Sequence, residues 1–437
     1  MKSVFAANVR MPRFDRLSED ASADVLVIGG GITGILTAYL LQDAGVDVLL
    51  VEAGRLCHGQ TANTTAKITV QHGFIYADLL RRFGKEGARQ YWDANNAALA
   101  GYRRMAREID CDFRIAPFYA YAMKDRRALG EELAALSAIG ANAGFSSASE
   151  LPFETVGAVV VPDQAAFQPL QLLAALAARL RVAEQTTVVS LHEGGAVTRD
   201  GVRITARHTV VATHFPFLRF RAGFPFKMYQ SRSYVLGIEG VEPLDGMYAD
   251  GKGEHLSLRT AGNCLLIGGA GHRTGVQGGG YDELADLASI YYPHGRIKYR
   301  FAAQDCITPD HVPYIGRYGK NTDSLWVATG FGKWGMTTAM VAAMLLRDSL
   351  LGIDNPYAKL FSPGRSPAVL GIASNMMHTL WHYLRPTVPR CPHLGCALVW
   401  NRQEQSWDCP CHGSRFDRSG KWLDNPAIRD LRKKPRS

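Results

Sequence analysis

The sequence predicts an α/β fold with more than one domain. At 437 residues the chain is too long for a single hydrophobic core. An apolar, β-branched run over residues 24–28 leads into a glycine-rich turn and then into apolar residues at helical spacing. A second apolar run, 46–51, follows and ends on Glu52. Strand, turn, helix and strand in this order indicate a helix packed on a sheet.

The glycine turn predicts a dinucleotide-binding site. Gly29 lets the chain turn sharply, Gly31 lets the backbone approach a pyrophosphate, and Gly34 lets the helix pack closely on the sheet. The helix N-terminus offers unpaired N–H groups to the phosphates, and Glu52 is placed to accept hydrogen bonds from both ribose hydroxyls. A plain surface turn is the alternative, but the flanking strand, helix and acid stand at the required offsets.

A loop rich in small hydroxyl residues, 55–69, extends this site. Directly after the ribose-binding acid, it can run along the pyrophosphate and ribityl chain and offer N–H and O–H donors; a plain polar loop is the alternative. The residues assigned to the cofactor in this loop are Arg55, Thr61, Thr64, Thr65 and Ala66.

The middle of the chain alternates between two predicted domains. Helical patterns over 76–110 and 127–139 belong to a substrate-side domain and carry no visible chemistry. The nucleotide domain resumes with a helix over 168–180 and a short strand in which Val188 lies beside the adenine. One arm of a hairpin, 202–206, and a buried strand, 208–214, complete this return.

Two strands, 229–238 and 263–269, predict an antiparallel substrate sheet. Polar side chains on and near these strands are candidates for holding an anionic substrate group, although each is also compatible with packing or a surface position. These candidates are Tyr229, Arg232, His272 and Arg273.

A second glycine-rich turn follows a strand over 324–330 and opens a helix that runs to residue 346. The partial positive charge of that helix N-terminus, about half an elementary charge, would stabilise an anionic reduced flavin. Two such turns in one chain favour FAD over NAD. The residues assigned to FAD here are Gly330, Gly332, Trp334, Gly335, Met336 and Thr337, and His214, Tyr314 and Trp334 are catalytic candidates that could equally be packing residues.

With these motifs, residues 24–347 resemble the FAD-dependent oxidoreductases of the D-amino-acid oxidase and glycine oxidase superfamily. The chain is most similar to a bacterial subgroup in which the flavoprotein is fused to a C-terminal Rieske domain, and the stretches 64–69 and 330–336 are typical of that subgroup. The resemblance implies oxidation of a carbon–nitrogen bond in an amine or amino acid by hydride transfer to the flavin.

The C-terminal cysteines and histidines support this resemblance. Residues 391–393 and 409–412 form C-x-H, fifteen residues, then C-x-x-H. A Rieske centre takes two thiolates on one iron and two imidazoles on the other, which assigns Cys391 and Cys409 to one iron and His393 and His412 to the second. Zinc is the alternative, but Gly395, Gly413 and the additional cysteines favour Rieske. In the resembled domains, the residues matching Cys396 and Cys411 form a disulfide.

Two features depart from the Rieske pattern. Phe416 stands near the position where high-potential Rieske proteins carry a tyrosine that donates a hydrogen bond to a ligand sulfur. Residues 355–391 are too few and too helical for the usual β base, and 366–384 predict an amphipathic linker helix instead. The module is therefore expected either to rest directly on the flavoprotein or to fail to keep its cluster.

The predicted architecture is a Rossmann-like FAD-binding domain, an antiparallel-sheet substrate domain and a small β Rieske module. The FAD-binding domain takes residues 20–75, 155–225 and 310–352, and the substrate domain takes 76–154 and 226–309. A linker helix, 353–385, leads to a shortened Rieske [2Fe-2S] module, 386–437.

Charge and composition exclude several classes of protein. The net charge is +9, and residues 385–437 contribute +6, from eleven Lys or Arg against five Asp or Glu. The basic stretch 432–436 predicts a solvated tail, because no aromatic interleaving or binding motif accompanies it to suggest nucleic acid. No signal peptide or membrane span is evident, so a cytoplasmic protein is expected.

The predicted function is an FAD-dependent oxidoreductase, an amine or amino-acid dehydrogenase or oxidase, whose electrons leave singly through a Rieske [2Fe-2S] cluster. Its expected partners are the small-molecule substrate and a one-electron acceptor protein. One alternative is an oxidase that uses oxygen and has a vestigial Rieske module. The other is a non-catalytic redox carrier or sensor.

Overall fold

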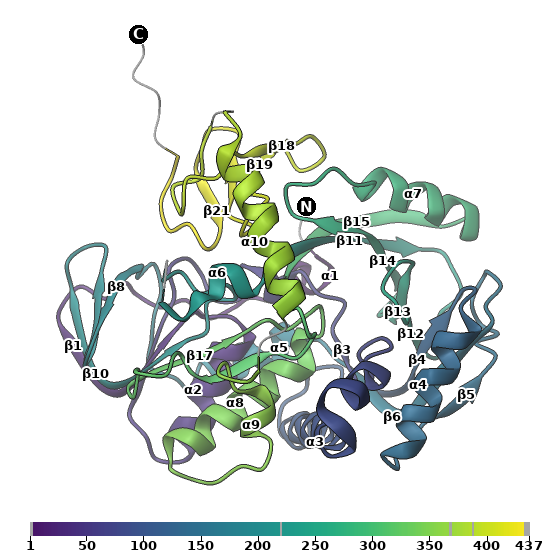
Figure 1. Ribbon diagram of the computed structural model, residues 1–437, viewed down its shortest axis with the longest axis horizontal. Helices are drawn as coiled ribbons and strands as arrows, with labels where there is room; N and C mark the ends of the chain where they lie inside the picture. The colour runs from purple at the N-terminus through teal and green to yellow at the C-terminus, as the bar shows by residue number, and fades with distance from the viewer. Residues whose placement is uncertain (1–2, 219–220, 367–368, 387–388, 432–437) are drawn as a thin grey trace.

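The computed structural model describes residues 3–218, 221–366, 369–386 and 389–431. Within these residues the chain forms two large β-sheets and a small third one. The large sheets lie side by side, and the C-terminal module sits above them, joined by the long helix α10 (Val369–Leu384) (Figure 1). The basic tail predicted over 432–436 lies outside the described residues.

The first sheet is the predicted nucleotide-binding sheet. Its strand order is β16-β17-β10-β1-β2-β7, with the β8–β9 hairpin attached through β9. β1 is parallel to β2 and β10, and β10 is parallel to β17, as a Rossmann-like sheet requires. The strands are β1 (Ala21–Ile28), β2 (Val48–Val51), β7 (Val182–Ala183), β8 (Val188–His192), β9 (Gly195–Thr198), β10 (Arg203–Val211), β16 (Tyr314–Arg317) and β17 (Leu325–Thr329).

Alternation along β1 and β2 explains how this sheet is covered. Val25 and Val27 on β1 belong to a core that includes the apolar sides of the helices, whereas Leu26 and Ile28 face a separate core on the other side. The helices of this domain are α2 (Ile32–Asp43), α5 (Pro169–Ala177) and α8 (Gly335–Leu350). The predicted hairpin arm and the predicted buried strand prove to be one continuous strand, β10.

The second sheet has nine strands in the order β15-β11-β14-β13-β12-β4-β6-β3, with β5 paired to β6. It is antiparallel except where β12 runs parallel to β4. Its strands are β3 (Lys67–Ile68), β4 (Arg114–Ala122), β5 (Gly144–Ser146), β6 (Gly157–Ala166), β11 (Tyr229–Glu239), β12 (Met247–Asp250), β13 (Ser257–Ala261), β14 (Cys264–Arg273) and β15 (Arg296–Ile307).

Two strands of this sheet lie in segments that the sequence had assigned to the FAD-binding domain. β3 falls within 20–75 and β6 within 155–225. β6 pairs with β4 along nearly its whole length, from Arg114 opposite Ala166 to Ala122 opposite Gly157. An apolar run of this kind suits either sheet, so only the long-range pairing with β4 decides its place.

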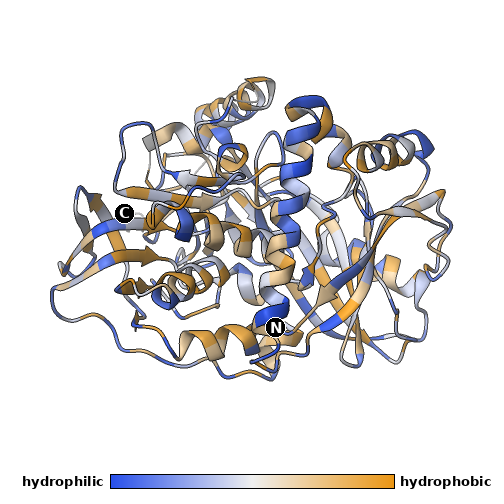
Figure 2. Cartoon of the chain, turned by 90° about the horizontal axis from the view of Figure 1, so that it is seen from below, coloured by the Kyte–Doolittle hydropathy of each residue, from blue (hydrophilic) through white to orange (hydrophobic). Residues whose placement is uncertain are grey.

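The remaining helices lie around the sheets. The substrate-side helices occur as predicted, and the longer one, α3, is interrupted at Gly84, where φ is +69°. Viewed from below, interior helices and strands are mainly hydrophobic, whereas many outer loops are hydrophilic (Figure 2). These helices are α1 (Val4–Ala7), η1 (Gln60–Ala62), α3 (Tyr76–Met105), α4 (Arg126–Ala138), η2 (Arg221–Gly223), α6 (Phe224–Lys227) and α7 (Gly280–Tyr291).

The C-terminal module is small and rests on the flavoprotein. Its four strands, β18 (Val399–Asn401), β19 (Ser406–Asp408), β20 (Arg415–Asp417) and β21 (Trp422–Asp424), form an antiparallel meander. Two helices, α9 (Ala358–Phe361) and α10 (Val369–Leu384), precede it. The predicted linker helix is thus confirmed, and helix rather than strand precedes the cluster loops in the described residues. Among those residues no helix is both long and apolar enough to cross a bilayer.

Candidate FAD and iron–sulfur sites

The turn after β1 has the geometry of a dinucleotide-binding turn. Gly29 has φ +111°, and a Cβ there would lie 2.5 Å from the carbonyl oxygen of Ala212. A Cβ on Gly34 would lie 1.8 Å from the carbonyl oxygen of Gly29, so α2 packs directly against its own turn. A Cβ on Gly31 would have Thr61 Oγ1, at 3.1 Å, as its nearest neighbour, and Gly31 lines a cavity.

Glu52 is fixed at the tip of β2 by two backbone amides. The N–H of Gly30 donates to Oε2 and the N–H of Gly54 donates to Oε1, each at 2.7 Å. Burial raises the pKa of this carboxyl, while the two amide hydrogen bonds oppose the rise. Each carboxylate oxygen retains a further lone pair for a ribose hydroxyl on the cavity side.

Several polar groups of the loop after β2 form ion pairs and hydrogen bonds within the protein. Arg55 forms an ion pair of 2.5 Å with Glu184, and Thr61 Oγ1 accepts from the N–H of Ile32 at 3.0 Å, at the start of α2. Thr64 Oγ1 accepts from the N–H of Ala66 at 2.9 Å, and Ala66 has φ +53°. The loop is therefore held in one shape around the cavity.

The second glycine turn leads into α8. Gly330 has φ +79°, and a Cβ there would lie 2.4 Å from the Thr308 side chain. Thr337, in the first turn of α8, accepts from the N–H of Thr69 at 3.0 Å and donates to the Thr69 carbonyl at 2.9 Å. This pair of hydrogen bonds joins the two segments predicted to hold FAD.

These segments border one cavity of about 1010 Å³, at the upper end of the range of about 300–1,000 Å³ for ligand pockets. Predicted FAD residues that line it are Gly29, Gly31, Glu52, Arg55, Thr61, Thr64, Thr65, Val188, Gly330, Trp334, Gly335 and Met336. Predicted FAD residues outside this lining are Gly34, Ala66, Gly332 and Thr337.

Two titratable residues of the cavity were missed from the sequence. Lys67, on β3, is 6% exposed and donates a short hydrogen bond to Ser257; burial, with nearby Arg259, lowers its pKa to about 7. Burial raises the pKa of Asp305, while His214 and Lys333 oppose the rise. The sequence did not reveal Lys67 or Asp305, because a single lysine in a predicted polar loop and a single acid on a strand form no periodic pattern.

Of the catalytic candidates, His214 and Trp334 line the cavity and Tyr314 does not. His214 has φ +65°, an unusual conformation for a non-glycine residue that concentrates at functional sites, and burial lowers its pKa. Trp334 stacks on His72, with ring centroids 5.0 Å apart. Tyr314 lies beneath the Arg365 guanidinium, 4.1 Å from its ring centroid, which supports the packing alternative.

The four substrate candidates lie toward the C-terminal module. Arg232 lines the cavity, but it is bound to Glu404 of the module, with Nε 2.9 Å from Oε2. Arg273 Nη1 donates to Asn375 of α10 at 3.1 Å and its guanidinium lies 4.6 Å from the Tyr229 ring centroid. His272 Nε2 is 2.9 Å from the Tyr234 hydroxyl oxygen. Only Arg232 of these four borders the cavity.

The cluster site consists of two loops with the same hydrogen-bond pattern. In the first, Gly395 N–H donates to the Cys391 carbonyl and Cys391 N–H to the Cys396 carbonyl, each at 2.9 Å. In the second, residues 409–414 repeat both bonds at the same distances. Gly395 and Gly413 both have φ +82°, which explains the glycine in each loop.

The loops bring the predicted ligands together. The imidazole rings of His393 and His412 lie 5.1 Å apart and nearly perpendicular. His412 is fully buried, and in the described part of the chain neither of its ring nitrogens has a hydrogen-bond partner. Hydrogen bonding to neighbouring thiols, Cys391 first, lowers the pKa of the Cys409 thiol. A fully buried imidazole beside a cluster of buried thiols fits metal ligation.

The two further cysteines lie in the same cluster. The sulfurs of Cys396, Cys409 and Cys411 lie within 4.8 Å of one another, and Cys396 and Cys411 are free thiols in the structure. Their disulfide therefore stays a prediction. Phe416 is fully buried among these residues, and it has no hydroxyl to donate to a ligand sulfur.

Amide side chains of the cavity wall hold the second cluster loop. Gln230 Nε2 donates to the His412 carbonyl at 2.6 Å, and Gln304 Nε2 donates to the Gly413 carbonyl at 2.8 Å. The N–H of Gln304 donates to Gln60 Oε1 at 2.6 Å, and Gln60 Nε2 donates to Asp424 at 3.1 Å. The FAD loop, the cavity wall and the cluster module are thus joined directly.

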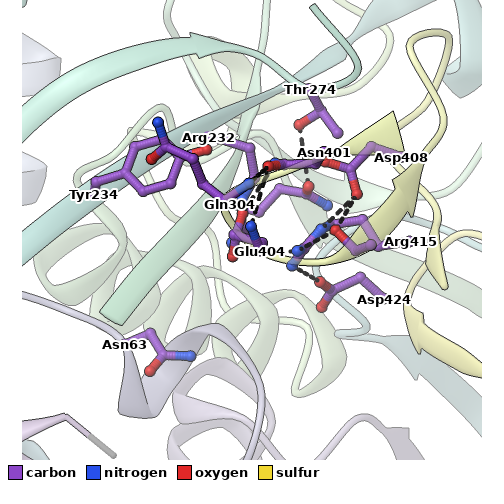
Figure 3. Close-up of polar contacts among 12 residues, drawn as sticks. Asn63, Arg232, Tyr234, Thr274, Gln304, Asn401, Glu404, Asp408, Arg415 and Asp424 are labelled. Carbon is purple, nitrogen blue, oxygen red and sulfur yellow. Dashed lines mark hydrogen bonds and ion pairs between the residues drawn. The ribbon is translucent and has the colours of Figure 1, made fainter. Parts of the chain in front are cut away.

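A charged network reinforces this contact (Figure 3). Arg232, whose side chain is 2% exposed, pairs with Glu404, which also contacts Arg415 at 3.1 Å. Arg415 reaches Asp408 at 3.0 Å and Asp424 at 3.1 Å. Burial disfavours the charged form of Arg415, but the three carboxylates outweigh it and raise its pKa. Arg415, Asp424 and Asn425 also line the cavity, so the module forms part of its wall.

The residues present fit both cofactors. The open space beside Gly31 and the spare lone pairs of Glu52 suit the pyrophosphate and ribose of FAD. The two thiol and two imidazole side chains of the paired loops suit a [2Fe-2S] cluster of the Rieske type.

Comparison with known proteins identifies the two domains that contain these sites. The family of FAD dependent oxidoreductases (DAO) matches residues 24–349, and the Rieske [2Fe-2S] domain matches 379–435. YhfW of Bacillus subtilis, which is named a putative Rieske 2Fe-2S iron-sulfur protein, is 34% identical over 484 aligned residues, covering 97% of this chain and 95% of that protein. Gamma-glutamylputrescine oxidoreductase of Escherichia coli is 30% identical over 124 residues, 28% of this chain and 29% of that protein.

Among solved structures, glycine oxidase from Geobacillus kaustophilus superposes with a TM-score of 0.66 at 19% identity, covering 79% of this chain and 99% of that one. This likeness shows a shared fold. Together with the two domain matches, it identifies the chain as a member of the DAO family of FAD-dependent oxidoreductases that carries a C-terminal Rieske domain, with FAD and a [2Fe-2S] cluster as its cofactors.

Proposed function

We propose that this enzyme oxidises the carbon–nitrogen bond of an amine or amino acid and that the electrons leave singly through the Rieske cluster. When bound, FAD accepts a hydride and the [2Fe-2S] cluster carries one electron at a time. The chain's own part is to place the substrate, to handle its proton and to keep the two cofactor sites together.

The shared wall between the sites is the observation that carries the proposal. Gln230 and Gln304 line the cavity or stand in its wall and also donate to the carbonyls of the second cluster loop. These amides are buried, so the contact is a fixed one. A module that only followed the flavoprotein in sequence would not need to complete the cavity with its own residues.

The charges of the cavity suit a small amine or amino acid. Asp305 offers a carboxylate to an ammonium group, and Lys333 offers a cation to an anionic group. Lys67, whose pKa is lowered to about 7 by burial, can accept the proton that an ammonium must lose before its carbon–hydrogen bond is broken. The amine-acting relatives named above support the same substrate class.

An anaerobic screen of amines and amino acids, with flavin absorbance as the readout, tests the first half of this proposal. A substrate should bleach the flavin of both the wild type and Cys409→Ser at similar rates, because Cys409 lies in the cluster loops. With a one-electron acceptor, Cys409→Ser should turn over at least about tenfold more slowly.

Two results would contradict the proposal. If no amine or amino acid bleaches the flavin, the substrate class is wrong. If Cys409→Ser turns over as fast as the wild type with every acceptor, oxygen included, the cluster is not on the electron path and the enzyme is an oxidase.

A further inference from the structure

Helix α10 presents its apolar side to solvent. Six of its large apolar side chains are between 49% and 68% exposed: Met376, Met377, Leu380, Trp381, Tyr383 and Leu384. At 3.6 residues per turn they occupy an arc of about 160°. A helix of a globular protein normally turns such a side toward the core, so this orientation needs an explanation.

The opposite side of α10 is polar and fixes this orientation. Asn375 is 4% exposed and accepts from Arg273 at 3.1 Å, and the rings of His378 and His382 lie together, 4.6 Å apart. The carbonyl of His382 accepts from the N–H of Ala397 at 3.1 Å, beside the first cluster loop. A Cβ on Gly371 would lie 2.4 Å from Pro309. The helix is therefore held by its polar side, and the apolar side remains outward.

Along the sequence, the stretch that contains this helix is basic. Residues 355–403 contain no Asp or Glu and five basic residues, of which the Arg365 side chain is buried in an ion pair with Asp310. Arg385 lies 6.0 Å from the Trp381 ring centroid at the C-terminal end of the helix, and both Arg385 and Arg390 are exposed. Aromatic side chains with arginine at the edge of an apolar face are typical of helices that lie at a membrane interface.

We propose that α10 docks this enzyme on the surface of an anionic lipid bilayer, with Met377, Leu380, Trp381 and Leu384 in the interface and Arg385 and Arg390 at the headgroups. With 16 residues the helix is about 24 Å long, shorter than the hydrocarbon core of about 30 Å, so it lies on the membrane. A second copy of the chain is a poorer occupant, because pairing two such faces would bring arginines together without a nearby acid.

Vesicle flotation of the full chain tests this proposal. The wild type should float with vesicles of phosphatidylcholine and phosphatidylglycerol at three to one and stay unbound with phosphatidylcholine alone. Leu380→Glu should reduce the bound fraction at least about tenfold, and Arg385→Ala should reduce it less. Ile290→Glu is the matched control, because Ile290 is an equally large apolar residue, 69% exposed, on α7; it should bind as the wild type does.

Flavin and iron contents equal to those of the wild type would show that each variant is folded. Wild-type protein that stays unbound with anionic vesicles would overturn the proposal, as would Ile290→Glu losing binding as much as Leu380→Glu. A concentration-dependent dimer that Leu380→Glu abolishes, seen by sedimentation in the absence of lipid, would assign the face to a second copy instead.

Discussion

The cluster site lies within residues 391–414, whereas the walls of the flavin cavity come from segments as distant as Gly29 and Asn425. Each cluster loop closes its own hydrogen bonds, so its ligands are positioned mainly by local contacts, to which Gln230 and Gln304 add bonds to two carbonyls of the second loop. The cavity acquires its shape only when two sheets and the C-terminal module have docked. A locally built site should lose its cofactor through single ligand changes, and an assembled cavity should respond to changes far from the cofactor.

The largest expected effect separates folding from cofactor binding in the flavin site. Gly34→Val puts a side chain where even a Cβ would lie 1.8 Å from a backbone carbonyl, so soluble folded protein should be lost. In Gly31→Val the Cβ meets only the Thr61 side chain, at 3.1 Å, apart from its chain neighbours, so the variant should fold but hold less than about a tenth of the wild-type FAD. Circular dichroism and flavin absorbance measure the two results; a yellow Gly31→Val protein would refute the assignment.

Next is the loss of a single cluster ligand. His412→Ala should abolish the Rieske signal in electron paramagnetic resonance and leave the FAD content unchanged, because the imidazole is buried in its own loop. His192→Ala, at an exposed position, is the control and should keep the signal. Zinc in place of iron in protein made anaerobically with ample iron would show that the ligand assignment to a Rieske centre is wrong.

A smaller effect is expected where the two regions meet. Glu404→Gln leaves the buried Arg232 guanidinium without its full counter-charge, at a cost of about 3 kcal/mol. The thermal midpoint should fall, and electron transfer to the cluster should slow. Glu131→Gln removes an exposed ion pair with Arg127 and should leave the midpoint unchanged. Equal midpoints for the two variants would mean that this contact does not hold the module.

The pH dependence of the free energy of unfolding should reveal the lowered pKa of Lys67. The pKa of this amine is about 7 in the folded protein and 10.5 for the ordinary group. Between pH 7 and 10.5 the unfolded chain binds a proton on Lys67 that the folded chain does not. Lys67 therefore makes the free energy of unfolding rise with pH, by up to about 1.4 kcal/mol per pH unit. Urea unfolding at pH 7.5 and 9.5 should show a smaller rise for Lys67→Met than for wild type. Parallel profiles would place the folded pKa near its ordinary value.

The smallest expected effect is a change in the reduction potential of the cluster. Phe416→Tyr can restore a hydrogen bond to a ligand sulfur, and a bond worth about 1 kcal/mol corresponds to about 40 mV for one electron. The cluster potential should rise by that order in a redox titration. Phe416→Leu, which adds no donor, should leave the potential nearly unchanged, and a similar rise in both variants would rule out the hydrogen bond as the cause.

Sequence reasoning grouped residues that lie together in the structure where the signal is local. The turn at Gly29, the acid at Glu52 and the cluster ligands follow one another at short, characteristic spacings, and the structure brings each group together. It failed where position depends on distant partners. β6 pairs with β4 in the second sheet, and Gln304 meets Gln60 across 244 positions. No local pattern marks such contacts. The lowered pKa of Lys67 likewise results from burial, which a local pattern does not reveal.

The Gln60 side chain has a consequence for how the holoenzyme assembles. It stands in the FAD loop, accepts from Gln304 and donates to Asp424 of the Rieske module. If bound FAD orders this loop and so strengthens the seating of the module, the seated module must strengthen FAD binding by the same factor, because such coupling is reciprocal. A substitution that loosens the module, such as Glu404→Gln, would then weaken FAD binding in a protein whose flavin-site residues are all intact.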